Sequence, residues 1–146
     1  MTDAPALTRL HPHAPLIHAL IEAYNAHDHE RVAAFYADDF VGEDVAQAQP
    51  QHGLAEVRRL MVYYYRAFPD LHIDLREAIF EADRAVLVWV MRGTQRGTFM
   101  RIPPTGRSVA VRGTTVLTLR DGLIHRALRV WDVAGLLRAI GLLPEL

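Results

Sequence analysis

A carboxylate at the end of an apolar alternation is the strongest candidate for chemistry in this sequence. Leu128, Val130 and Asp132 occupy every second position, so they share one face of a predicted strand. A carboxylate that follows an apolar row toward the core loses hydration, which strengthens it as a base. Such a group can remove a proton from carbon next to a carbonyl and later return it to an alkoxide. Asp132 is therefore a candidate general acid/base.

Asp132 has a second interpretation, because the residues that follow it have the pattern of a short helix. The segment 133–140 reads VAGLLRAI, and an aspartate directly before a helix is a preferred N-cap. One carboxylate oxygen can accept the capping hydrogen bond while the other faces a pocket. The sequence leaves both roles open.

Five other residues are candidates for contacts with a substrate. Tyr24 lies on the apolar stripe of a predicted helix, where its hydroxyl either stabilises a substrate enolate or is a satisfied group of the core. Trp89, Met91 and Gln95 share one face of a predicted strand. They either line an apolar cavity, with Gln95 as its polar group, or pack in the core. His52 precedes a predicted helix near the expected rim of the pocket.

The remaining polar groups give no reason to expect a metal or a cofactor. The pairs His11/His13 and His27/His29 fall in turns or arms, where solvated histidines are common. The chain has no cysteine, which excludes thiolate catalysis and zinc–cysteine sites. It also has no glycine-rich loop of the kind that holds phosphates, so we expect no nucleotide cofactor.

Hydrophobic periodicity predicts helices mainly in the first half of the chain and strands in the second. The helices are expected at 16–25, directly after Asp28, at 54–68 and at 133–140, and the strands at 71–82, 84–97, 107–119 and 123–132. The segment 40–51 shows no clear period and is expected to follow a surface or rim. This order indicates an α+β fold, in which a curved antiparallel sheet wraps around the helices and leaves a cone with an internal pocket.

Length and composition describe one globular domain. The chain has 146 residues and a formal net charge of −1, so no bulk charge favours nucleic acid. Prolines at positions 5, 12 and 15 predict an irregular arm over residues 1–14, followed by a single domain over 15–146. No apolar run is long enough for a membrane span, and the first residues lack a signal-peptide pattern. We therefore expect a cytoplasmic protein.

Several motifs together resemble a known family. They are AYNAHDHERVAAFYADDFV, FPDLHIDL, RGT at 92–94, GTFMRIPPTGRSVAVRG, DGLI at 121–124 and RVWDVAGLLRAIGLLP. In this order they resemble the SnoaL-like polyketide cyclases, or ester cyclases, of the NTF2-like superfamily. The resemblance implies a cofactor-free enzyme that closes a ring of an aromatic polyketide ester by intramolecular aldol condensation. The family's catalytic carboxylate matches Asp132.

Other functions stay open within the same fold. Ketosteroid-isomerase-like chemistry and epoxide hydrolysis also use buried carboxylates in an apolar cone, and a non-catalytic module for ligand binding or dimerisation is a further alternative. In each case we expect a small hydrophobic ligand. We also expect a homodimer through the outer face of the sheet, because Val86, Val88 and Val90 leave that face apolar.

Overall fold

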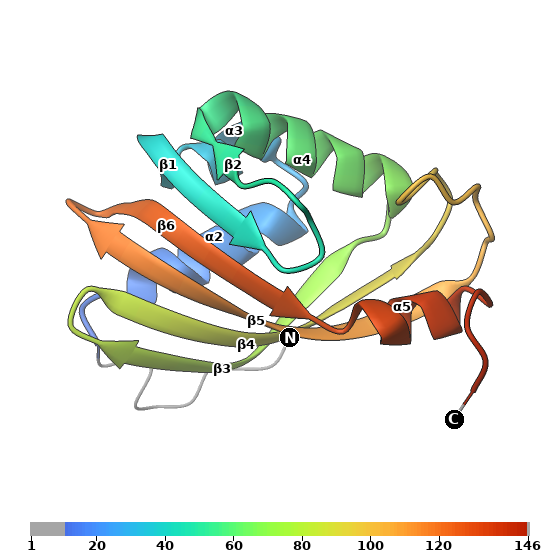
Figure 1. Cartoon of the computed structure of the whole chain (residues 1–146). Coiled ribbons are helices and arrows are strands. Elements are labelled where there is room, and N and C mark those ends of the chain that lie inside the picture. The colour runs from blue at the N-terminus through green and yellow to red at the C-terminus, as the bar shows by residue number, and fades with distance from the viewer. Residues whose placement is uncertain (1–10, 146) are drawn as a thin grey trace.

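A computed structural model describes residues 11–145 and shows a curved six-stranded sheet with helices packed against it (Figure 1). The elements in chain order are α2 (Ala14–Asn25), α3 (His29–Ala33), β1 (Tyr36–Asp44), β2 (Gln51–His52), α4 (Gly53–Ala67), β3 (His72–Glu81), β4 (Arg84–Thr94), β5 (Ser108–Arg120), β6 (Leu123–Trp131) and α5 (Val133–Ala139). The sheet is curved and unclosed, which confirms the predicted α+β class. Most of the arm predicted over 1–14 lies outside the described residues. No helix within 11–145 is long and apolar enough to cross a membrane.

The strand order places β1, from the first third of the chain, beside β6, the last strand. The order is β2-β1-β6-β5-β4-β3, and β1 pairs with β6 in parallel while every other neighbouring pair is antiparallel. The hairpin between β5 and β6 turns at Asp121 and Gly122, both with positive φ, as the Asp-Gly pair predicted. The parallel pairing sets Asp44, the last residue of β1, beside Arg129 of β6, and Asp44 is buried there.

Sequence periodicity did not reveal strand β1 or the two-residue strand β2. The segment 40–51, which shows no clear period and is expected to follow a surface or rim, contains the second half of β1 at residues 40–44 and the first residue of β2 at Gln51. Two adjacent exposed carboxylates, Asp38 and Asp39, and a register shift between Tyr36 and Val41 break the alternation. Because the partner strand β6 lies near the other end of the chain, no local signal marks this segment as a strand.

The helices close the sheet with an apolar stripe, as predicted. Val57 and Met61 of α4 are buried, and they belong to one core cluster with Leu75, Leu87 and Leu117 of the sheet. In Figure 1, α2 and α4 lie on the same side of the sheet. Burial of these side chains at about 25 cal/mol per Å² is the main force that holds helices and sheet together.

The loop between β4 and β5 is held by one fully buried amide. β4 ends at Thr94 and β5 begins at Ser108, so Pro103 and Pro104 interrupt the sheet as expected. Gln95 donates from Nε2 to the carbonyls of Ile102 and Pro103, at 3.1 and 3.3 Å. Its Oε1 accepts from the amide and the hydroxyl of Thr105, at 3.2 and 2.7 Å. The side chain therefore acts as the internal support of this loop.

The change Gln95→Leu should lower the free energy of unfolding by about 2 to 4 kcal/mol, because it removes the four hydrogen bonds that the buried amide makes to the loop. Urea unfolding followed by circular dichroism measures this loss. Gln49→Leu makes the same chemical change at an exposed loop position and should change the free energy by less than about 0.5 kcal/mol. Equal effects of the two changes would contradict the role given to Gln95.

Candidate functional site

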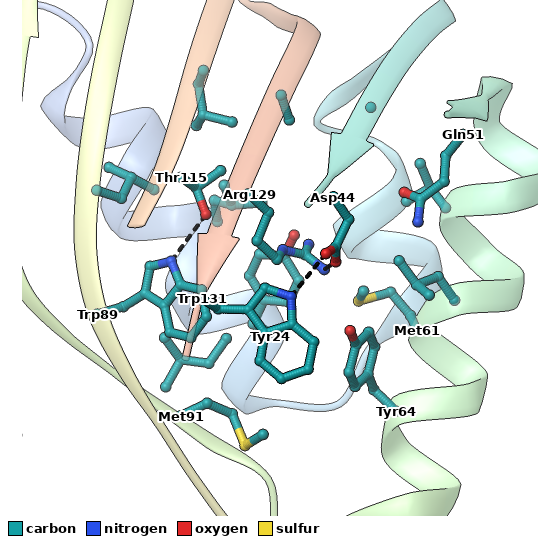
Figure 2. A pocket seen from close by; sticks show the side chains of 18 of the residues that line it. Tyr24, Asp44, Gln51, Met61, Tyr64, Trp89, Met91, Thr115, Arg129 and Trp131 are labelled. Atoms are coloured by element: carbon teal, nitrogen blue, oxygen red, sulfur yellow. Dashed lines mark hydrogen bonds and ion pairs between the residues drawn. The ribbon is translucent and has the colours of Figure 1, made fainter. Parts of the chain in front are cut away.

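An apolar pocket lies between helices α2 and α4 and the inner face of the sheet (Figure 2). Its volume is about 110 Å³, of the same order as an engineered cavity of ~150 Å³ that holds benzene. Most of its wall is aliphatic or aromatic, including Leu20, Met61, Leu87, Met91, Phe99, Val111 and Leu117. Such a pocket suits a hydrophobic, ring-sized ligand, and its few polar groups determine what chemistry it can support.

The only buried carboxylate in the described chain belongs to Asp44, which lines this pocket at 6 % exposure. Its Oδ1 accepts hydrogen bonds from Trp131 Nε1 at 2.8 Å and from the Ala46 amide at 2.9 Å. Its Oδ2 is buried and has no hydrogen-bond donor among the described residues. The nearest cation is Arg129, whose Nη1 lies 3.7 Å from Oδ2. One oxygen is thus fixed by two donors, of which Figure 2 shows Trp131, and the other accepts no hydrogen bond and lies near Arg129.

Arg129 is the counter-charge of this carboxylate. It points inward from β6, keeps 23 % exposure of its side chain and lies over the ring of Tyr64, with its Cζ 5.9 Å from the ring centroid. Burial by itself disfavours the charged guanidinium, but Tyr64, Tyr24, Tyr36 and Asp44 outweigh this effect, and the pKa of Arg129 is raised. The guanidinium is therefore charged at every accessible pH.

Two tyrosine hydroxyls form a second polar group in the pocket wall. The hydroxyls of Tyr24 on α2 and Tyr36 on β1 lie 2.5 Å apart, so one donates to the other. Burial, followed by the proximity of Tyr24, raises the pKa of Tyr36 well above its ordinary value. Tyr65 donates to the Tyr24 carbonyl at 2.9 Å and anchors the helix end. The two hydroxyls have two protons, and their mutual hydrogen bond uses only one of them. The other O–H is left to donate to a ligand.

The indoles of Trp89 and Trp131 form the aromatic wall on either side of Gly113. Any side chain at Gly113 would overlap the Trp89 ring and crowd the Cβ of Trp131, so the bare backbone of β5 leaves room for the Trp89 ring. Trp89 Nε1 donates to the Thr115 hydroxyl at 2.9 Å, and Trp131 is held by Asp44. Both rings are therefore fixed in orientation before any ligand binds.

Three of the residues predicted to contact a substrate line the pocket, and two do not. Tyr24, Trp89 and Met91 are in the pocket wall. Gln95 is directed into the β4–β5 loop, where all its hydrogen bonds are used locally. His52 is exposed at the start of α4, and its backbone amide donates to Glu56 Oε2.

Asp132 lies at the N-cap of α5, where its Oδ1 accepts from the Gly135 amide at 2.8 Å. It is outside the set of residues that line the pocket. The predicted orientation of β6 is wrong by one residue: Arg129 and Trp131 point into the pocket, whereas Leu128 and Val130 are exposed. The pairing of Trp131 with Gly113 on β5 sets this register, and a shift of one residue exchanges the two faces of a strand. The catalytic role of Asp132 stays a prediction.

Sequence reasoning missed the central polar residues of the pocket, Asp44 and Arg129. Asp44 lies in the segment without visible period, and Arg129 resembles any charged residue on a half-exposed strand. The one available signal was the Arg129/Trp131 alternation, which runs opposite to the aliphatic row. Residues 11–145 contain no group of three or more histidine, aspartate or glutamate side chains arranged to hold a metal ion.

Comparison with known proteins identifies the family. The model of the SnoaL-like polyketide cyclase family matches residues 14–140, so the chain belongs to this family. A search of curated proteins gives no match.

Solved structures with the same fold are numerous. AclR from Streptomyces galilaeus, described as a candidate hydroxylase, is 26 % identical with a TM-score of 0.81, over 90 % of this chain and 86 % of AclR. IdmH from Streptomyces antibioticus, described as a candidate polyketide cyclase, is 25 % identical with a TM-score of 0.77, over 90 % and 99 % of the two chains. A protein from Catenulispora acidiphila described with a ketosteroid isomerase-like fold is 17 % identical with a TM-score of 0.75, over 88 % and 93 %, and shows the shared fold alone.

The two pocket tryptophans offer a matched test of how firmly Asp44 is held. Trp131→Phe removes a donor to a buried carboxylate and should cost about 2 to 3 kcal/mol of unfolding free energy beyond the lost ring area. Trp89→Phe removes a donor to a neutral hydroxyl and should cost about 1 kcal/mol on the same scale. Urea unfolding of both variants gives the comparison. A cost for Trp131→Phe no larger than that for Trp89→Phe would show that its bond to Asp44 is weak.

Proposed function

We propose that this SnoaL-like protein is a cofactor-independent enzyme that carries out acid/base chemistry, of the intramolecular aldol type, on a small hydrophobic carbonyl compound in this pocket. The observation that carries the proposal is the buried Asp44 carboxylate, with one oxygen fixed and the other free of donors, in an apolar and aromatic cavity. A base in such a place is poorly hydrated and close to the ligand, as proton abstraction from carbon requires.

An aldol closure needs one base and stabilisation of two oxygens, and the pocket offers groups for each. Asp44 takes a proton from the carbon next to one carbonyl, and the resulting enolate oxygen accepts from the free hydroxyl of the Tyr24–Tyr36 pair. The enolate carbon then forms a bond to a second carbonyl carbon of the same molecule. The oxygen of that carbonyl becomes an alkoxide beside Arg129 and takes the proton back from Asp44. No proton is gained or lost overall.

The position of Asp44 supports it better than Asp132 as the acid/base group. Asp44 is in the pocket wall, whereas Asp132 caps α5 and lies outside that wall. Both assignments require the same chemistry, because each gives the acid/base role to one carboxylate near the end of a strand. They differ in what each aspartate touches, and substitutions of the two residues separate them. A ketosteroid-isomerase-like proton shift uses the same base and oxyanion groups. It also begins with proton abstraction from carbon, so exchange of carbon-bound protons with the solvent reports on both reactions.

Exchange of carbon-bound protons for solvent deuterium tests the proposal without knowledge of the natural substrate. 2-Tetralone is a small aromatic ketone whose exchange in deuterated water is followed by proton NMR. The protein should accelerate the exchange, and Asp44→Asn, which keeps the shape but removes the base, should reduce the acceleration by about 10²-fold or more. Asp132→Asn should reduce it by less than about threefold.

The outcomes separate the competing assignments. If Asp132→Asn abolishes exchange and Asp44→Asn does not, the acid/base role belongs to Asp132. If the wild-type protein accelerates proton exchange of neither 2-tetralone nor a panel of related cyclic ketones, the chain is a binding module and the enzymatic proposal is wrong. Urea unfolding of both variants checks that any loss of exchange is not a loss of folding.

We further propose that two copies of the chain pair through the outer face of the sheet. This face presents aliphatic side chains from four strands: Ile79, Val86, Val88, Val90, Val116, Leu128 and Val130. Ile79, Leu128 and Val130 are 52 %, 37 % and 45 % exposed in the single chain. A contiguous apolar face of this kind is typical of a self-complementary interface between identical subunits.

The change Val130→Glu places a charge on that face and should convert a dimer into a monomer in light scattering coupled to size-exclusion chromatography. The side chain is exposed in the single chain, so the fold should survive the change. Met100→Glu places the same charge on an exposed residue of the β4–β5 loop, and this variant should stay dimeric. A wild-type protein that runs as a monomer at micromolar concentration would refute the pairing.

A further inference from the structure

We propose that the Asp44–Arg129 pair is a binding site for one neutral hydroxyl group carried on a flat ring. The inference rests on the proposed function in one respect: the hydroxyl is the group that ring closure would leave beside Arg129. Geometry and charge alone support the binding site, and its test measures binding without any catalytic turnover.

Asp44 Oδ2 is a buried oxygen without a hydrogen-bond donor among the described residues. A buried carboxylate oxygen without a donor is costly, and such an exception in a folded protein calls for an explanation. Asp44 Oδ1 is already occupied by Trp131 Nε1 and the Ala46 amide, so the side chain cannot turn to satisfy Oδ2 without losing two bonds. Oδ2 is the atom that a ligand donor would satisfy.

The distance between Asp44 Oδ2 and Arg129 Nη1 indicates that the ligand places one atom between them. Oδ2 and Nη1 are 3.7 Å apart, beyond the usual range of a direct hydrogen bond. A single oxygen at about 2.8 Å from each atom can bridge them, donating to Oδ2 and accepting from Nη1. Oδ2 is covered by its neighbours, whereas the Arg129 side chain keeps 23 % exposure, so the flexible guanidinium is the group that gives way as the hydroxyl enters.

Charge selects a neutral group that both donates and accepts. A carboxylate ligand would be attracted by Arg129 and repelled by Asp44, and an ammonium would meet the opposite pair of forces. The other polar groups that face this pair are the hydroxyls of Tyr64 from α4, Tyr24 from α2 and Tyr36 from β1, and burial raises the pKa of both Tyr64 and Tyr36. An ether or ketone oxygen accepts from Arg129 but leaves Oδ2 without a donor. A hydroxyl satisfies both.

The surrounding rings indicate what carries the hydroxyl. Trp131 and Tyr64 lie on either side of the charge pair, and Trp89 continues the wall (Figure 2). Aromatic faces of this kind favour stacked or edge contacts with a flat ring. The complete ligand feature is therefore a planar or nearly planar ring with one hydroxyl directed at Asp44 and Arg129.

Four toluenes that differ only in the para substituent test this selection. They are 4-methylphenol, 4-methylanisole, 4-methylbenzoate and 4-methylbenzylamine; the phenol is neutral at pH 7 because phenolic groups titrate near pH 10. Binding is followed by NMR of the 15N-labelled protein at the two indole N–H signals, since the chain has two tryptophans and both line the pocket. The dissociation constant of 4-methylphenol should be at least about tenfold lower than those of the other three.

Two variants assign the preference to Asp44. In Asp44→Asn the amide places a donor where Oδ2 accepts, so the preference for the phenol over the anisole should fall below about threefold. Asp38→Asn makes the same change on the exposed side of β1 and should keep the full preference. Equal binding of phenol and anisole to the wild-type protein, or tighter binding of the benzoate or the amine, would overturn the proposal. The wild-type comparison stands even if Asp44→Asn does not fold.

Failure of this test and failure of the proposed function are distinguishable. A protein that prefers the phenol but exchanges no ketone protons would have the hydroxyl site without the catalysis. A protein that exchanges ketone protons through Asp44 but shows no preference for the phenol would be an enzyme without this site, and the present inference would be wrong.

Discussion

A carboxylate inside an apolar core persists only if its neighbours compensate its charge, and Asp44 is compensated from two elements. Trp131 and Arg129 reach it from β6, and the Ala46 amide reaches it from the turn after β1. Leaving a buried charge unpaired typically costs several kcal/mol, so this group of contacts also constrains the fold. The parallel pairing of β1 with β6 is the feature that brings these groups together. The rest of the pocket is arranged around that pairing.

The aromatic part of the pocket wall is fixed before any ligand arrives. Gly113 leaves room for the Trp89 ring against β5, and the N–H groups of both indoles are already bonded. The hydroxyls of Tyr24 and Tyr36 are held by each other, and Tyr65 ties the end of α2 to α4. Polar groups that are oriented in advance stabilise developing charge without reorganisation at the moment of reaction. The loop supported by Gln95 contributes Phe99 to the same wall, so its proline-rich sequence serves the pocket indirectly.

The orientation of strand β6 explains why the sequence pattern points to Asp132 and not to Asp44. Its aliphatic residues, Leu128 and Val130, face outward, and its polar and aromatic residues, Arg129 and Trp131, face inward. The usual rule that apolar residues point to the core fails here for two reasons. The inner face carries a charge pair, and the outer face continues an apolar surface shared by several strands. Asp132, next in the aliphatic row, then falls at the start of α5, where its carboxylate caps the helix.

The sequence by itself determined the elements whose signals are local. Periodicity placed α4 and the strands β3 to β6, the Asp121–Gly122 turn followed from its residue types, and the motifs identified the family that the comparisons confirm. It also placed Tyr24, Trp89 and Met91 on inward apolar faces, but it left open whether they pack in the core or line the pocket, where the structure finds them. Only the tertiary structure revealed the Asp44–Arg129 pair. These residues lie far apart in the chain, on a strand without visible period and on a strand whose register is set by its neighbours. Local patterns carry no information about which distant strands pair, and a shift of one residue in register decides which side chains meet.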